Sequence, residues 1–186
     1  ADLVQRLSGG PIRAFCHSRN QGKGAALRTA IEHVAGEIVV IQDADLEYDP
    51  KDIPTLVQPI LEGHADVVYG SRFRGQTQRV HMFWHQLANN LLTAFSNIMN
   101  NLNLSDMETG YKAFRLEVVR KLSLCSDRFG IEPELTAKVA RMGCRVYEVP
   151  ISYHGRTYEE GKKIRWTDAV WALVAIVRFG ILPESF

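Results

Sequence analysis

Three carboxylates stand at alternate positions directly after an apolar run of the sequence. Asp43, Asp45 and Glu47 follow residues 38–41, Ile-Val-Val-Ile, which predict a strand buried on both faces. Side chains at i and i+2 of extended backbone point the same way, so the first two carboxylates can reach one cation. Mg²⁺ and Mn²⁺ prefer such oxygen ligands and also bind phosphates. The spacing therefore predicts a divalent-metal site that could screen a diphosphate.

A second interpretation assigns these carboxylates to the start of a helix that we expect over residues 49–61. A capping carboxylate must stand next to the first turn of its helix. That role suits Asp49, whereas Asp43 and Asp45 lie too far upstream. We therefore favour the metal site.

Positive charge is supplied by a glycine-containing turn and by two basic clusters. Residues 20–24, Asn-Gln-Gly-Lys-Gly, precede a predicted helix, so their amides and Lys23 could face an anion. An ordinary strand-to-helix turn is an equally good interpretation, because the spacing of a Walker loop is missing. By themselves, the basic clusters around Arg72 and Arg156 would be taken as solvated surface.

The elements that must position these residues alternate in the first half of the chain. We expect strands over residues 12–16, 38–41 and 65–70, with helices over 25–34 and 49–61 between them. This order is typical of an α/β fold with a mostly parallel sheet. Ligands bind at the carboxyl ends of the strands in such sheets, which is where the carboxylates lie.

The second half of the chain begins with a predicted loop over residues 72–80 and is more helical. We expect helices over residues 83–100, 116–122, 134–142 and 166–179, and strand segments over 111–114, 145–149 and 151–153. The chain opens on what we interpret as a helix remnant over residues 3–7, so we expect the first strand of the sheet to be missing. With no repeat or linker visible, we predict one domain over residues 1–186, truncated at its N-terminus.

Bulk composition bounds the possible partners and compartment. The net charge of +1 across 186 residues gives no reason to expect nucleic-acid binding. The three cysteines form no CxxC pair, which suits a reducing compartment. No apolar run approaches the ~20 residues of a membrane span. These features predict a cytoplasmic location.

Taken together, the motifs resemble the family-2 glycosyltransferases of the GT-A fold. Within them, the chain looks like the branch of dolichol-phosphate mannose synthases and bacterial polyprenyl-phosphate glycosyltransferases. The resemblance is carried, in the family's order, by residues 20–24, 43–45, 70–73, 106–112 and 148–151, and by Arg156 with residues 161–163. These stretches cover nearly the whole chain, and their order is more specific than any one motif.

The resemblance implies roles for the charged residues. Asp43, Asp45 and Glu47 would hold Mg²⁺ or Mn²⁺, with Glu47 standing where many relatives carry Gln. Arg72 and Arg156 would meet the acceptor phosphate or the donor diphosphate, since a guanidinium binds phosphate oxygens bidentately. Asp45 and these two arginines form the expected catalytic set.

Four further residues are expected to bind substrate, namely Lys23, Ser71, Asp106 and Lys162. Asp106 opens the segment that faces the sugar in relatives. An equally good interpretation is that it fixes a turn before Gly110.

The implied reaction is an inverting transfer of a hexose from a nucleoside diphosphate sugar to a polyprenyl or dolichyl phosphate. A phosphate acceptor is ionised near neutral pH, so it needs cations to hold it and no strong base. An enzyme acting on a sugar hydroxyl would need a carboxylate base, for which Glu132 and Glu134 are candidates. Their ordinary role would be charge at a helix N-terminus. A catalytically inert fragment is the remaining alternative.

Two helices fit an acceptor that resides in a membrane. Residues 83–100 and 166–179 carry many large apolar side chains. The second helix, with Lys163, Arg165 and Arg178, resembles an interfacial helix. Burial against the sheet is the alternative. We expect peripheral association with the cytoplasmic face of a membrane.

Overall fold

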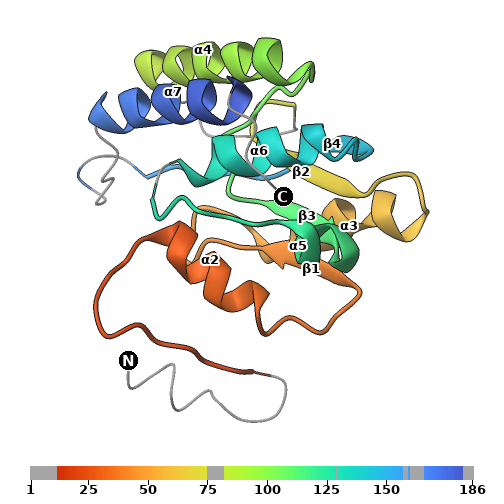
Figure 1. Ribbon diagram of the computed structural model, residues 1–186. Helices are drawn as coiled ribbons and strands as arrows, with labels where there is room; N and C mark the ends of the chain where they lie inside the picture. The colour runs from red at the N-terminus through yellow and green to blue at the C-terminus, as the bar shows by residue number, and fades with distance from the viewer. Residues whose placement is uncertain (1–11, 75–81, 129, 157–158, 160–165, 182–186) are drawn as a thin grey trace.

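The computed structural model describes residues 12–74, 82–128, 130–156, 159 and 166–181 (Figure 1). Lys162, one of the expected substrate-binding residues, lies outside these residues. The strands of the described chain are β1 (Ile38–Ile41), β2 (Val67–Ser71), β3 (Lys112–Arg115) and β4 (Val146–Pro150). The helices are α2 (Lys23–Ile31), α3 (Ile53–Leu61), α4 (Phe83–Asn100), α5 (Leu116–Lys121), α6 (Ile131–Arg141) and α7 (Trp166–Ile181), with a 3₁₀ turn η1 (Pro50–Asp52).

The strands form a mixed sheet in the order β1-β3-β2-β4. β2 and β4 pair in parallel, whereas β3 lies antiparallel to both β1 and β2. β1, β2 and β4 therefore run in one direction, and the predicted α/β class with mostly parallel strands is confirmed. The reversed direction of β3 is a feature that the sequence pattern did not show.

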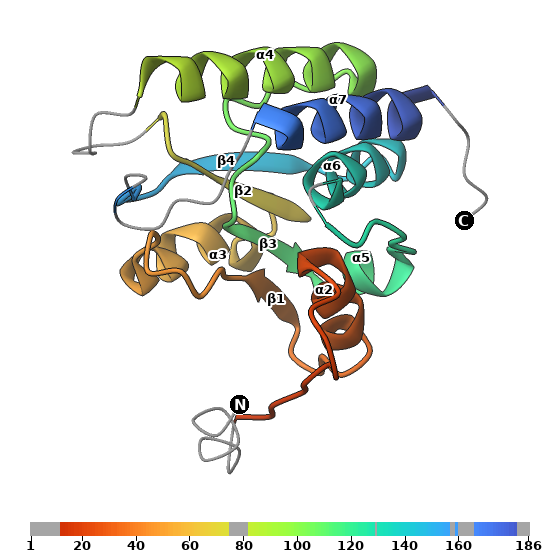
Figure 2. The same cartoon turned by 90° about the vertical axis from the view of Figure 1, so that its left-hand side faces the viewer.

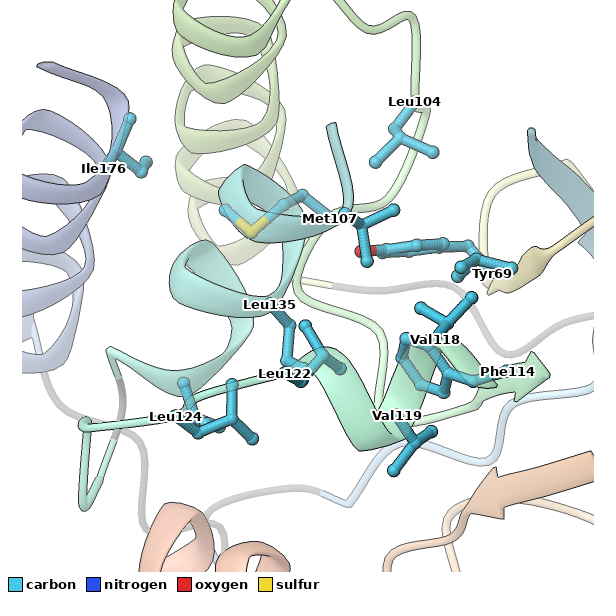
Figure 3. Close-up of a cluster of buried hydrophobic side chains, with 13 residues drawn as sticks. Tyr69, Leu104, Met107, Phe114, Val118, Val119, Leu122, Leu124, Leu135 and Ile176 are labelled. Carbon is cyan, nitrogen blue, oxygen red and sulfur yellow. The ribbon is translucent and has the colours of Figure 1, made fainter. Parts of the chain in front are cut away.

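Both faces of the sheet are covered, as the continuous apolar strands predict. Tyr69 and Phe114 point to one face, where they pack with Leu135 of α6 (Figure 3). Val68 and Ala113 point to the opposite face and pack with α3. Successive residues of a strand point to opposite faces, so each short strand contributes to both cores.

Two long helices form an outer layer above α6. α4 and α7 lie side by side and both contact α6, as the two views agree (Figures 1 and 2). The structure confirms the predicted bounds of α4 and places the end of α7 two residues beyond the predicted one. In the described part of the chain, no helix combines the length and apolar character needed to cross a membrane.

The predicted strand over residues 12–16 is wrong. Ile12 forms only an isolated bridge, and residues 13–17 have no regular structure. Ile12 and Phe15 remain exposed, and Phe15 packs on the ring of His33 at 3.9 Å between ring centroids. An apolar alternation makes a strand only where a neighbouring strand accepts its hydrogen bonds, which local sequence cannot show. The predicted segment over residues 151–153 is likewise reduced to a bridge between Tyr153 and Tyr48.

Candidate functional site

A cavity of about 630 Å³ lies at one edge of the sheet, between the strand ends and the helices α2, α4, α6 and α7. Asp43 follows β1, Arg72 follows β2 and Arg156 follows β4, so three parallel strands deliver these residues to the same edge. β3 runs antiparallel to these strands, so the residues that precede β3 lie at the same edge of the sheet. One of them, Glu108, lines the cavity.

The structure brings most of the predicted site residues together. Six of them line the cavity, namely Lys23, Asp43, Asp45, Glu47, Arg72 and Arg156. Ser71 and Asp106 do not line it and are fully buried beside it. Their positions favour a supporting role over direct contact with a ligand.

Lys23 is the cation at the start of α2. Its ammonium lies 2.9 Å from Asp43 and 2.8 Å from Glu132 of α6. Burial lowers the pKa of Lys23, but the charges of Glu132 and Asp43 outweigh that effect and raise it above its ordinary value. Lys112, which is fully buried, also pairs with Glu132. Lys23 is therefore charged at any physiological pH.

Two amides of the turn before α2 donate hydrogen bonds within the protein. The Gly22 amide donates to the Asn20 side chain at 2.9 Å, and the Gly24 amide donates to the Asp127 carbonyl at 2.8 Å. Gly22 has a φ of +98°, and a Cβ there would lie 2.3 Å from the Asp127 carbonyl oxygen. These two amides are therefore not available to an anion, whereas the Lys23 side chain lines the cavity.

Glu47 and Arg156 form an ion pair beyond the carboxyl end of β1. One carboxylate oxygen of Glu47 accepts from the Arg156 backbone amide at 2.9 Å and from its Nε at 3.0 Å. The other oxygen accepts from the Tyr153 hydroxyl at 2.8 Å. Although burial opposes it, these hydrogen bonds hold the pKa of Glu47 below its ordinary value. Glu47 is thus an ionised carboxylate with its oxygens in use.

The backbone between Asp45 and Glu47 departs from the extended conformation. Leu46 has a φ of +64° and an almost fully exposed side chain. This left-handed conformation is costly for leucine, so the extended pattern behind the predicted alternation is broken here. Asp45 keeps a contact of 3.3 Å with Arg156. Burial, together with the charges of Glu47 and Asp43, raises the pKa of Asp45.

These carboxylates suit a metal ion that is bound partly by the protein and partly by a substrate, rather than one bound by protein ligands alone. Among the described residues, no three His, Cys, Asp or Glu side chains converge closely enough to hold a metal ion on their own. Asp43 and Asp45 both line the cavity and offer only oxygen donors. Mg²⁺ is commonly bound by one or two carboxylates, with substrate phosphates and water completing its shell.

Arg72 is anchored from behind by Asp106. Its Nε and Nη2 atoms each donate to one carboxylate oxygen at 2.7 Å, and its backbone amide donates to the same group at 3.1 Å. Asn89 of α4 accepts a further hydrogen bond from Nη2 at 3.1 Å, and the guanidinium lies 5.1 Å from the Tyr153 ring centre. Ser71 bonds the Ser105 hydroxyl at 2.7 Å in the same support. Arg72 is therefore presented in one conformation.

Comparison with known proteins decides the family. The model of glycosyl transferase family 2 matches residues 1–123. The chain belongs to this family. It is 31% identical to the glycosyltransferase AglJ of Haloferax volcanii over 73% of this chain and 45% of that protein. It is 32% identical to the undecaprenyl-phosphate mannosyltransferase of Micrococcus luteus over 68% of this chain and 53% of that protein.

Solved structures show the same fold. Glucosyl-3-phosphoglycerate synthase of Mycobacterium tuberculosis, solved with Mn²⁺, UDP-glucose and phosphoglyceric acid, has a TM-score of 0.63 and 22% identity to this chain. The match covers 97% of this chain and 60% of that one. The GT-A fold expected from the motifs is confirmed. The family-2 chain spans about half of the length of the curated relatives named above.

The two carboxylates considered as bases take different places in this family-2 fold. Glu134 lies outside the cavity wall and accepts from the amides of Cys125 and Ser126, each at 2.7 Å. Glu132 lines the cavity, but its pKa is lowered because the charges of Lys112 and Lys23 outweigh the effect of burial. A carboxylate held by two ammonium groups is a weak base, so neither residue suits that role.

Glu108 is the functional candidate that the sequence did not bring out. It lines the cavity, and its Oε1 atom is buried without a hydrogen-bond partner among the described residues. It lies inside the stretch of residues 106–112 that carries part of the family resemblance. Glu108 stands between Met107 and Thr109, which are both buried. Charged side chains are rarely buried without a partner, so an acidic residue in such a segment could have indicated a functional role.

Among the described residues of this family-2 chain, the cavity wall carries more acidic than basic side chains. Its described lining includes the carboxylates of Asp43, Asp45, Glu47, Glu108, Glu132 and Asp168. The described lysine and arginine side chains there are Lys23, Arg72, Arg128 and Arg156. The formal charge of this wall is therefore negative when every carboxyl is ionised. An anionic ligand needs added positive charge before it can bind well.

Proposed function

We propose that this chain transfers a hexose from a nucleoside diphosphate sugar to a polyprenyl phosphate, with inversion and with the help of a divalent cation. The observation that carries the proposal is one cavity that combines Asp43 and Asp45 with Arg72 and Arg156. Such a set suits two phosphate-bearing groups, one bridged by a cation and the other held by guanidinium groups.

The names of relatives support the acceptor class. The Micrococcus luteus relative is named for mannosyl transfer to undecaprenyl phosphate. A second relative, from Edwardsiella ictaluri, is named undecaprenyl-phosphate 4-deoxy-4-formamido-L-arabinose transferase and is 28% identical over 83% of this chain. Both names describe transfer to a lipid phosphate, which agrees with the acceptor that we propose.

Asp43 and Asp45 would hold Mg²⁺ or Mn²⁺ together with the donor diphosphate. When bound, the cation would stabilise the negative charge that builds up on the departing diphosphate. The acidic residues of the described cavity wall favour the binding of a cation. A protein of the same fold from Mycobacterium tuberculosis was solved with Mn²⁺ and UDP-glucose. Glu47, which the family resemblance also makes a ligand, serves better as the residue that positions Arg156.

The arginines and Lys23 would hold the anionic groups in line. Arg72 is already oriented by Asp106, so little side-chain freedom is lost when it binds a phosphate. Arg156 keeps two short bonds to Glu47, whereas its 3.3 Å contact with Asp45 is the weaker one. A cation bound at Asp45 would replace that contact and leave one face of Arg156 available to phosphate.

The outer face of α4 and α7 would bring the chain to the lipid acceptor. Trp84 and Ile98 of α4 are exposed by 74% and 77%, and Trp171 of α7 by 65%. The same two helices line the cavity through Leu92 and Ala172. We therefore propose that this layer rests on a membrane surface, where large aromatic and aliphatic side chains are favoured.

The membrane contact is tested by co-sedimentation with vesicles that contain anionic lipid. The Trp84→Asp, Trp171→Asp double variant should lose most of its vesicle-bound fraction. Leu61→Asp is the matched control, because Leu61 is also well exposed but lies on α3, across the sheet from α4 and α7 (Figure 1). Equal binding by the wild type and the double variant would contradict this contact.

The transfer itself is tested by a donor screen. The chain is incubated with Mn²⁺ and a set of radiolabelled UDP- and GDP-hexoses, together with a polyprenyl phosphate and a free sugar as competing acceptors. Formation of a glycosyl phosphoryl polyprenol from at least one donor is the expected result. Transfer to a sugar hydroxyl in place of the lipid phosphate would contradict the proposed acceptor and support the alternative that the sequence left open.

A further inference from the structure

Glu108 has no part in the mechanism above, yet it lines the same cavity. Its segment precedes β3, and it lines the cavity together with Lys23 and Arg72. The Oε1 atom is shielded from solvent and has no hydrogen-bond partner within the described residues. A buried oxygen without a partner costs free energy and requires an explanation. A bound ligand that forms a hydrogen bond with this oxygen would provide that explanation.

The backbone on either side of Glu108 is held in place. The Met107 amide donates to the Thr93 hydroxyl of α4 at 3.2 Å, and the Gly110 amide donates to the Tyr48 hydroxyl at 2.7 Å. A Cβ at position 110 would lie 2.4 Å from an Asp43 carboxylate oxygen and 2.9 Å from a carbon of the Tyr48 ring, so the segment packs closely there. The Glu108 side chain is therefore presented to the cavity by a fixed support, as a ligand-binding group requires.

The surroundings of Glu108 favour its neutral form. Burial raises the pKa of Glu108 to about 7, and the nearby charge of Glu132 acts in the same direction. Lys112 and Arg72 oppose this shift, and Asp106 adds to it. A phosphate brought into the cavity would add another negative charge and raise the pKa further. The carboxyl would then be protonated near neutral pH.

A proton on Glu108 would reduce the negative charge of the cavity when a phosphate binds. The described wall is acidic, and each phosphoryl group that enters makes the total more negative. A divalent cation offsets two of these charges, and a proton on Glu108 removes one more. The protonated carboxyl also turns an acceptor into a donor, which is what a phosphate oxygen needs.

We propose that Glu108 binds phosphate as a neutral carboxylic acid, donating a hydrogen bond to an oxygen of the donor diphosphate or of the acceptor phosphate. The proposal rests on the proposed function only in that a phosphate ligand enters this cavity. One proton passes from solvent to the Glu108 carboxylate on binding and returns to solvent on release, and no covalent bond to the ligand changes. A general base would instead have to be ionised when its substrate binds.

Proton uptake on binding tests the proposal directly. Calorimetric titrations are run at pH 7.5 in two buffers of different ionisation enthalpy. One arm uses Mn²⁺ with inorganic pyrophosphate as the diphosphate probe, and the other uses farnesyl phosphate as the acceptor probe. Wild type should take up roughly 0.5 proton or more with at least one probe beyond the uptake seen with Glu108→Gln. The arm that shows this difference identifies which phosphate Glu108 meets.

The pH dependence of affinity gives a second readout. Wild-type affinity for that probe should fall by up to about tenfold per pH unit above pH 7, relative to Glu108→Gln. The Gln side chain keeps a neutral donor, so this variant should still bind at pH 7. Glu108→Ala removes the donor and should bind about tenfold more weakly at that pH. Glu117→Gln, an exposed position on α5, is the matched control and should behave as the wild type does.

The outcomes separate the two proposals. Equal proton uptake and equal pH dependence in wild type and Glu108→Gln would overturn the role of Glu108 and leave the proposed function intact. A folded wild-type chain that binds neither probe would overturn both. Unchanged binding together with complete loss of transfer in Glu108→Gln would identify a general base and would overturn the neutral-acid role.

Discussion

Two arginines line the same cavity, and their pairings with carboxylates differ in how firmly they are held. Arg72 and Asp106 share a bidentate pair with both bonds at 2.7 Å, and the Asp106 side chain is fully buried. Arg156 is 38% exposed and divides its guanidinium between Glu47 and Asp45, the latter at 3.3 Å. The first pair is a fixed support, whereas the second can exchange partners. A transferase that binds and releases phosphates needs both kinds.

The largest effect is expected where the fixed pair is broken. Asp106→Ala leaves the Arg72 guanidinium largely buried and without its carboxylate, which should lower the free energy of unfolding by about 3–5 kcal/mol. Urea denaturation followed by circular dichroism measures this change. A loss below about 1 kcal/mol would show that Arg72 finds other partners and that Asp106 is not its main support.

Asp45→Asn should leave stability nearly unchanged and reduce transfer by about 100-fold or more. The substitution keeps the size of the side chain but weakens its hold on a cation. Initial rates with Mn²⁺ and the best donor measure the effect. Asp49→Asn is the matched control, because Asp49 caps η1 and lies outside the cavity lining. Full activity in a folded Asp45→Asn variant would remove Asp45 from the mechanism.

A smaller loss is expected at the exchangeable pair. Glu47→Gln removes the charge that orients Arg156, so transfer should fall by about tenfold. If Glu47 positions Arg156, the Mn²⁺ concentration for half-maximal rate should stay the same. A large rise in that concentration would instead make Glu47 a metal ligand, as the family resemblance first implied.

The smallest effect concerns acid stability. The pKa of Glu47 in the folded chain lies below its ordinary value of 4.5, so its ionised form contributes stability that is present above pH 4.5. That contribution is lost as the pH falls through the lowered pKa. Glu47→Gln should therefore lose less stability than wild type between pH 5 and pH 3, by urea denaturation at each pH. A steeper loss in the variant would reverse the sign and contradict the assignment.

The contrast between the two pairs also marks what the sequence could predict. The run over residues 38–41 and the carboxylates after it predicted both β1 and the site edge, because the burial of a strand can be read from its own apolar residues. The hydrogen bonds of Glu47 to Tyr153 and Arg156 were not predicted, because those residues lie more than 100 positions further along the chain. The backbone of Leu46, which precedes Glu47, is left-handed. A leucine carries no sequence signal for that conformation.

Glu108 was missed for a topological reason. The rule that ligands bind at the carboxyl ends of strands points to Asp43 and Arg72, which follow their strands. β3 is reversed, so the residues before it share that edge. Nothing local in residues 112–115 shows the direction of the strand, since direction is decided by the neighbours with which it pairs. The strand that was wrongly predicted over residues 12–16 has a similar cause, because a strand forms only where a neighbouring strand pairs with it.

The most direct test of the account is the binding of Mn²⁺ with a nucleoside diphosphate, because the central claim is that Asp43 and Asp45 hold a cation that the diphosphate completes. Electron paramagnetic resonance counts free Mn²⁺ in the presence of UDP or GDP and the chain. Wild type and Asp49→Asn should retain Mn²⁺ in a nucleotide-dependent way, and the Asp43→Asn, Asp45→Asn double variant should not. Equal retention of Mn²⁺ by the folded double variant would contradict the account.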